Sequence, residues 1–217
     1  MKNLAKLILA AVMTVSLFSA CGKAEEEPID VSDVKDMVFG SETPYILYCS
    51  EEKIIINGTF GVVVYDLENG KLTDRISLDK IRELGMVGYG NYASADGETI
   101  YFTDMLQNVG AVNSFVAYDV ESKTASPVKE ISDDEFREES WNWDGGRFQV
   151  KHYDPADYEK YYEKYIAEGC LIGDNSVPLE NEFVFLIVPS FMLYDTQIVV
   201  CGYDGSEKVY GVFDNSD

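Results

Sequence analysis

The sequence predicts a mainly antiparallel all-β protein, built as a propeller-like or irregular array of β repeats with one inserted helix. Three observations lead to this prediction. Short runs rich in β-branched and aromatic residues recur along the chain, turn signals such as Asn-Gly and Asp-Gly separate them, and one strand–turn–strand pattern occurs twice. Hydrophobic residues make up 46% of the 217 residues, which is enough for a substantial core.

Two successive groups of strands are expected in the first 131 residues. The first group covers 45–49, 53–58, 61–66 and 71–78, and the second covers 93–102, 114–120 and 125–131. Asn57-Gly58 predicts a turn between two runs of the first group. Asn69-Gly70 predicts a hairpin turn, because Asn and Gly accept the positive φ angles that such turns require.

The two groups share a repeated pattern. VVVYDLENGKLTDRISL, which starts at Val62, and FVAYDVESKTASPVKEI, which starts at Phe115, align with an offset of 53 residues. A weaker echo occupies 198–205. The pattern resembles the "YDLETGK" repeats of bacterial surface propellers, and the resemblance implies blades of about four strands. A closed propeller has about 4 to 8 blades and the chain has room for about four, so an irregular array or two packed sheets explain the pattern equally well.

The middle of the chain interrupts the repeat. Ser132-Asp133-Asp134-Glu135 has the form of a capping box, and 141–148 has the form of a hairpin. Asp154-Pro155 is a strong helix start, with an acidic N-cap and proline in the first turn, and predicts a helix over 155–168 that stops at Gly169. Strands are expected again at 182–188, at 191–194 and from 198 onward.

Aromatic residues of this middle part form the candidate ligand surface, which comprises Trp141, Trp143, Tyr158 and Tyr162. Tyr158, Tyr161, Tyr162 and Tyr165 share one face of the predicted helix, and the two tryptophans alternate in a predicted strand. Packing against the sheet explains the tyrosines, and burial in the core explains the tryptophans. The alternative is an aromatic platform for a sugar or a peptide.

Charge and composition exclude several classes of function. The net charge of −22 argues against nucleic acid as a partner, because phosphates require Lys and Arg, and it favours a soluble monomer. His152 is the one histidine, which excludes multi-histidine zinc sites. The acidic Asp-Gly turns lack the spacing of a calcium loop. We therefore predict no metal, no cofactor and no catalytic residue.

Cysteine use is sparse. Cys49, Cys170 and Cys201 remain once Cys21 is set aside, and their spacing fits no zinc motif. Three cysteines allow at most one disulfide. Cys49 and Cys201 lie in apolar runs, so buried free thiols are favoured over a disulfide.

The first 20 residues have the form of a bacterial signal peptide. Lys2 and Lys6 precede an apolar stretch that is too short to span a bilayer, for which about 20 apolar residues are needed. Leu17-Phe18-Ser19-Ala20-Cys21 resembles a lipobox, with Phe18 where leucine is usual. The resemblance implies cleavage before Cys21 and lipidation of its thiol. We expect a signal peptide at 1–20, an acidic tether at 21–32 and a single domain at 33–217.

These observations predict a lipid-anchored protein on the extracytoplasmic face of the cell membrane, which acts as a binding or sensing module without catalytic activity. The expected ligand is a protein, a peptide or the cell wall. Residues 45–78 are also similar to extracellular regions of membrane metallopeptidases of the β-lactam-sensor type, and this similarity implies a sensing or interaction role. The alternative is a carboxylate-dependent extracytoplasmic hydrolase or lyase, since the 39 acidic residues make chance carboxylate pairs inevitable.

We expect the substitution Cys21→Ser to abolish the incorporation of labelled fatty acid, because this thiol is the atom that would receive the diacylglyceryl group. Metabolic labelling of cells that express either form measures the effect. A natural form that stays unlabelled, and that is handled by the cell in the same way as Cys21→Ser, would contradict the lipid anchor.

Overall fold

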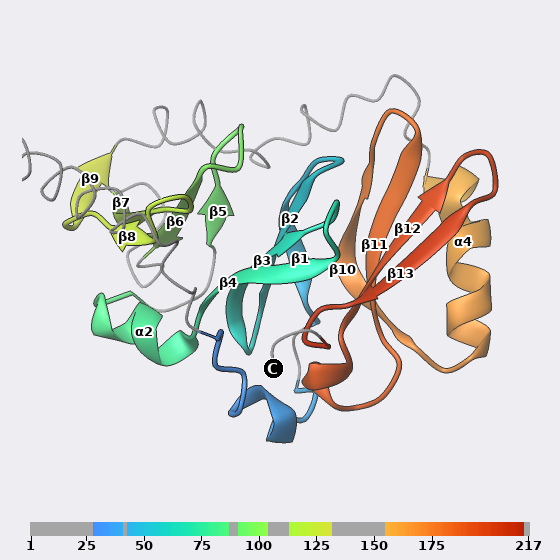
Figure 1. Ribbon diagram of the computed structural model, residues 1–217, viewed down its shortest axis with the longest axis horizontal. Helices are drawn as coiled ribbons and strands as arrows, with labels where there is room; N and C mark the ends of the chain where they lie inside the picture. The colour runs from blue at the N-terminus through green and yellow to red at the C-terminus, as the bar shows by residue number, and fades with distance from the viewer. Residues whose placement is uncertain (1–27, 41–42, 87–90, 104–112, 132–154, 215–217) are drawn as a thin grey trace, which may run out of the picture.

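The prediction of an all-β fold is confirmed. The computed structural model describes residues 28–40, 43–86, 91–103, 113–131 and 155–214, and in these residues three antiparallel sheets account for most of the regular structure. The strands of each sheet follow one another in chain order. The sheets lie side by side, as Figure 1 shows, and the described strands form no closed propeller.

Sheet 1 forms the centre of the molecule. It consists of β1 (Tyr45–Cys49), β2 (Lys53–Gly58), β3 (Gly61–Asp66) and β4 (Lys71–Ile76). The turn expected at Asn57-Gly58 is wrong by two residues, because both residues belong to β2 and the chain turns at Thr59-Phe60. Asn57 is buried and its side chain accepts a hydrogen bond from Asn91 (2.6 Å), so tertiary contact outweighs its local preference for a turn.

Sheet 2 packs on one side of sheet 1. It consists of β5 (Tyr92–Ala93), β6 (Thr99–Thr103), β7 (Asn113–Asp119), β8 (Thr124–Ala125) and β9 (Lys129–Ile131), with both short last strands paired to β7. The tight turn at Asp96-Gly97 precedes β6, as expected.

Sheet 3 packs on the other side of sheet 1. It consists of β10 (Leu171–Pro178), β11 (Glu182–Val188), β12 (Gln197–Gly202) and β13 (Glu207–Gly211). The expected strand at 191–194 is wrong: this segment ends in a short 3₁₀ helix, η2 (Leu193–Asp195). Strand β10 was not expected, because its centre is polar, and its register against β11 is irregular between Ile172 and Ser176.

The repeated pattern marks the third strand of each sheet. In each sheet, the residue directly after the third strand donates its backbone N–H to the carbonyl of the residue directly before the second strand. These bonds join Leu67 to Glu52 (2.8 Å), Val120 to Glu98 (2.9 Å) and Tyr203 to Asn181 (3.0 Å). Tyr203 therefore takes the place of Leu67 and Val120 instead of the place of Tyr65, and the sequence echo is out of structural register by two residues.

Sheet 1 is buried on both faces, which shapes the rest of the fold. In β2, Ile54 and Ile56 face the core shared with sheet 3, whereas Ile55 faces the core shared with sheet 2. In β3, Val63 faces sheet 3 and Val64 faces sheet 2. Successive side chains of a strand point to opposite faces, so one continuous apolar run supplies two cores.

Polar contacts fix the two junctions between sheets. At the junction with sheet 2, the Tyr118 hydroxyl donates to the buried Asp74 carboxylate (2.7 Å), and burial, followed by this hydrogen bond, raises the pKa of Tyr118. At the junction with sheet 3, the Asn175 amide accepts from the Ile46 N–H (2.7 Å) and donates to the Ile46 carbonyl (2.8 Å). Asn175 thus joins the edge of β10 to the edge of β1.

Helix α4 (Pro155–Ala167) covers the outer face of sheet 3, on the right of Figure 1. The helix predicted over 155–168 is confirmed, and Gly169, with φ of 85°, follows it. A second helix, α2 (Leu78–Glu83), was not expected: strand β4 ends at Ile76, and Ser77 caps the helix by accepting the Lys80 N–H. In the described part of the chain, no helix is both long enough and apolar enough to cross a membrane.

The N-terminal segment is clamped to sheet 1 by one arginine. The Arg75 guanidinium forms two bonds to the Asp33 carboxylate (2.6 and 2.7 Å) and also donates to the carbonyls of Asp30 and Phe60. The bonds from Arg75 hold the pKa of Asp33 below its usual value. Bidentate pairs of this kind are geometrically specific, so they fix where the chain enters the domain.

The expected tether over 21–32 overlaps the folded part of the chain. Val31 is buried, Ile29 packs on the core between sheets 1 and 3, and the 3₁₀ helix η1 (Val34–Asp36) follows. The apolar side chains of Ile29 and Val31 thus lie on the core within the range predicted for the tether. Residues 21–27 lie outside the described residues.

Two equivalent turn positions give a test of the repeat. Gly70 (φ 63°) and Lys123 (φ 55°) occupy the fourth position of the same four-residue turn, and a Cβ at Gly70 would only touch the Tyr210 ring at 3.6 Å. We expect Gly70→Ala to lower the free energy of unfolding by about 1 kcal/mol, since a side chain in the left-handed region costs about 1–2 kcal/mol. Lys123→Gly removes that cost, so it should cause no loss.

Urea unfolding of the full chain measures both effects. Gly40→Ala is the control, because its backbone does not require a positive φ and a Cβ there meets nothing within 4 Å. Equal losses from Gly70→Ala and Lys123→Gly would show that the two turns are not equivalent.

Candidate functional site

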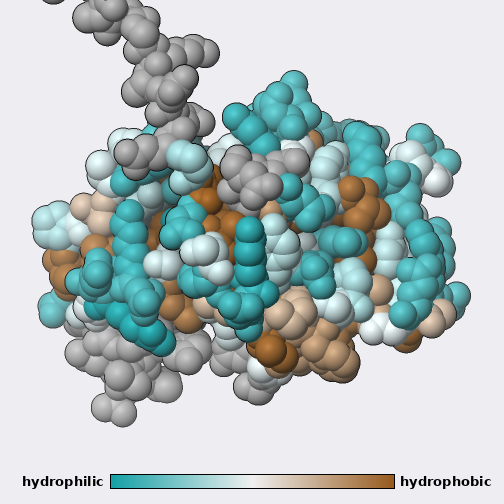
Figure 2. Space-filling model, turned by 60° about the horizontal axis from the view of Figure 1, so that its bottom comes forward, coloured by the Kyte–Doolittle hydropathy of each residue, from teal (hydrophilic) through white to brown (hydrophobic). Residues whose placement is uncertain are grey.

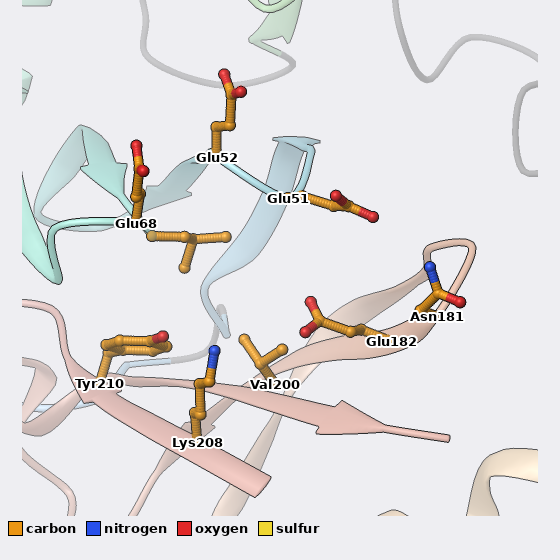
Figure 3. A pocket seen from close by; sticks show the side chains of 9 residues that line it. Glu51, Glu52, Glu68, Asn181, Glu182, Val200, Lys208 and Tyr210 are labelled. Carbon is orange, nitrogen blue, oxygen red and sulfur yellow. The ribbon is translucent and has the colours of Figure 1, made fainter. Parts of the chain in front are cut away.

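An open groove of about 550 Å³ lies between sheets 1 and 3, at the end where their turns meet. We call it the turn groove. It is lined by Glu51, Glu52, Leu67, Glu68, Asn181, Glu182, Val200, Lys208 and Tyr210. Sheet 1 lines one side of the groove with two turns, and sheet 3 lines the other side with β12, β13, the start of β11 and the turn before it, as Figure 3 shows.

The turns that carry the groove residues are held by local hydrogen bonds. The Ser50 hydroxyl accepts from the N–H groups of Glu52 (3.3 Å) and Lys53 (3.1 Å), which fixes the turn between β1 and β2. The Asp66 carboxylate accepts from the backbone and the side chain of Asn69 (2.8 and 2.7 Å), and these bonds lower the pKa of Asp66. Leu179 donates to the Glu182 carbonyl (2.7 Å) across the turn before β11. The backbone of the groove rim is therefore preorganised.

The turn groove is strongly acidic. It contains four glutamates and one lysine, and in the described part of the chain none of these five side chains belongs to an ion pair. Figure 3 shows Glu182 and Lys208 extending toward the space between the sheets, whereas Glu52 and Glu68 point outward from sheet 1. Carboxylates that have no internal partner are available to a positively charged ligand.

The floor below the groove is apolar and chemically inert. Tyr210 packs edge-on against the buried Tyr65, with ring centroids 6.0 Å apart, and burial together with nearby Tyr210 raises the pKa of Tyr65 to about 12. Burial, and after it the charge of Glu182, raises the pKa of the Cys49 thiol. Neither group ionises near neutral pH, so the acids and Lys208 carry the chemistry of this site.

The predicted aromatic surface is only partly described. Tyr158 is buried and stacks on Phe183, with centroids 4.2 Å apart, and Tyr165 is also buried. Tyr162 is half-buried and its hydroxyl lies 2.6 Å from that of Ser176. The packing explanation therefore holds for Tyr158, whose ring is covered by the sheet.

Other sequence-predicted positions lie outside the described residues. These are Trp141, Trp143, His152 and Cys21. In the part of the chain that the structure describes, no group of three or more His, Cys, Asp or Glu side chains has the geometry of a metal site. The three described cysteines, Cys49, Cys170 and Cys201, are free thiols, as favoured above.

Sequence reasoning did not find the turn groove. Glu51, Glu52 and Glu68 occupy turns of the first repeat, and Glu182 and Lys208 come from the third, more than 100 residues later. The only signal was the recurrence of acidic residues in turns, which is also ordinary turn chemistry. The packing of sheet 3 against sheet 1 brings these residues together.

Comparison with known proteins found no match for this chain: no family model, no curated protein and no solved structure is similar to it.

The thiols should differ in reactivity. Cys49 and Cys201 are buried and Cys170 is half-buried. Burial raises the pKa of all three, that of Cys201 to about 11, which lowers the fraction of reactive thiolate at pH 8. In the Cys21→Ser full chain at pH 8, we expect iodoacetamide to modify Cys170 first, and Cys49 and Cys201 only when urea is added.

Peptide mapping by mass spectrometry measures the order of modification. Because each pKa is raised, modification at Cys170 should become faster as the pH increases. Modification of Cys49 at the same rate as Cys170 in the native chain would show that the groove floor is open.

Proposed function

We propose that this protein is a lipid-anchored, extracytoplasmic binding module without catalytic activity, and that the turn groove binds a positively charged peptide segment of its ligand. The observation that carries the proposal is a set of carboxylates on the two rims of one groove that form no ion pair within the described residues. Glu51, Glu52 and Glu68 lie on turns of sheet 1, whereas Glu182, Lys208 and Tyr210 lie on strands of sheet 3, so a rigid scaffold holds the binding residues.

The position of the groove supports this role. In Figure 1 the turns that precede β2 and β11 are at the top, whereas the first described residues (blue) are at the bottom. If the chain is anchored through Cys21, the membrane therefore lies near the end of the domain drawn at the bottom of Figure 1, and the groove lies at the opposite end. A ligand outside the cell would reach it without displacing lipid.

Charge determines the kind of ligand. The chain has a net charge of −22, and four of its glutamates but one lysine line the groove. A field of this sign attracts cationic segments, raises their rate of association and repels anionic polymers. The half-exposed Tyr210 ring offers a surface for a lysine or arginine side chain.

A tetralysine peptide is a suitable probe for the groove. We expect the full chain to bind it, and we expect the triple variant Glu51→Gln, Glu52→Gln, Glu182→Gln to bind about tenfold more weakly. Each exposed charge pair contributes roughly 0.2–1 kcal/mol, so three lost pairs together account for that factor. Isothermal titration at low salt, repeated at higher salt, measures the effect, and salt should weaken the binding.

The matched control removes the same number of charges elsewhere. Glu83, Glu159 and Glu163 are exposed on α2 and α4, and their triple change to Gln leaves the groove intact. Both triple variants have the same net charge. If both triple variants weaken peptide binding equally, the peptide responds only to the overall charge of the protein, and the groove is not the binding site.

A further inference from the structure

A small apolar surface lies at the end of the molecule where the N-terminal segment enters. The chain around Val38 pairs with the chain around Met192: Leu193 donates to the Met37 carbonyl (2.9 Å) and Phe39 donates to the Phe191 carbonyl. Val38 is 62% exposed and Phe191 is 71% exposed. We call Val38 and Phe191, with the exposed Pro189 between β11 and η2, the tether-end patch.

The figures place this patch at the same end as the tether. The blue N-terminal segment and the segment of η2 lie together at the bottom of Figure 1, and η1 contacts η2. Figure 2 turns this bottom toward the reader and shows hydrophobic surface gathered at the lower centre of the molecule. The turn groove lies at the opposite end.

The chain length between Cys21 and the described domain limits how far this end can lie from a bilayer. Six residues lie between Cys21 and Pro28, where the described chain begins, so seven Cα–Cα steps join them. At roughly 3.3–3.6 Å per residue, this segment spans at most about 25 Å when fully extended. Arg75 then fixes the following residues to sheet 1, so a lipid on Cys21 holds the tether-end patch close to the membrane.

We propose that Val38 and Phe191 insert into the headgroup region of a neutral bilayer and so orient the domain with the turn groove facing away from the membrane. The inference rests on the lipid anchor of the proposed function. An exposed aromatic ring next to aliphatic groups suits the interface, where burial of apolar area gives reversible binding. Arg75 neutralises Asp33, and the exposed Asp36 and Asp195 outnumber the exposed Lys35 beside the patch, so this end has no positive excess that would attract anionic lipid.

We propose a bilayer and not a protein as the partner of the tether-end patch, because the lipid anchor keeps the bilayer next to the patch at all times. A lipid chain on Cys21 keeps the membrane at a high effective concentration beside the patch, so even a weak contact is occupied. A partner of the ordinary kind requires a larger area: a stable interface buries about 800 Å² on each side, far more than two or three exposed side chains provide.

The test places a tryptophan in the patch of the lipidated full chain. Phe191→Trp is compared with Ile166→Trp, since Ile166 is 61% exposed on α4 and lies outside the patch. Each protein is reconstituted into phosphatidylcholine vesicles with ordinary or brominated acyl chains. For Phe191→Trp, measured against the unsubstituted protein, we expect ordinary lipid to shift the tryptophan emission to the blue and brominated lipid to reduce its intensity further. For Ile166→Trp we expect neither effect.

The possible failures are distinguishable. Flotation of the proteins with the vesicles reports on the lipid anchor alone. If the proteins float but Phe191→Trp shows no more quenching than Ile166→Trp, the tether-end patch does not meet the bilayer, although the anchor stands. If they do not float, both proposals fail. A blue shift of Phe191→Trp that appears without vesicles and grows with protein concentration would assign the patch to a second copy of the chain and overturn the inference.

Discussion

The burial of sheet 1 on both faces is the constraint on which the rest of the structure depends. An antiparallel sheet usually keeps one face in water, but β2 and β3 are each buried at every position but one. Such a sheet is stable only when both faces are covered. Sheet 2 and sheet 3 cover one face each, and α4 in turn covers the outer face of sheet 3. The stability of the whole fold therefore depends on sheet 1, which shares one core with sheet 2 and another with sheet 3.

The turn groove is a consequence of this packing. Sheets 1 and 3 share a core of large aliphatic and aromatic residues, and Asn175 joins their edge strands. At the turn end the sheets separate, and the polar turn residues replace the core. Glutamates that form no ion pair with another described residue are tolerated there because the rims are exposed to water, where repulsion between like charges is screened. The same exposure leaves them available for a ligand.

The two ends of the domain thus have different chemistry. The tether end is pinned by the Arg75–Asp33 pair and carries exposed apolar side chains, whereas the turn end is acidic and concave. This polarity connects the two proposals: an anchored domain that rests one end on lipid presents the other to a cationic ligand. It also suits the large negative charge, which keeps the groove end away from an anionic surface.

The sequence by itself determined the class of fold, most strands, helix α4 and the repeat, because strand alternation, turn residues and helix caps are local properties. It also predicted the lipid anchor, whose residues lie outside the described part. Only the tertiary structure decided the rest. Asn57 lies in β2 instead of a turn, where it accepts a hydrogen bond from Asn91, and Tyr158 is buried because its ring stacks on Phe183 of sheet 3. Tyr203 occupies the position of Leu67 instead of that of Tyr65, as its backbone bond to Asn181 shows. The groove joins residues of the first and third repeats, and no local pattern specifies which sheets pack together.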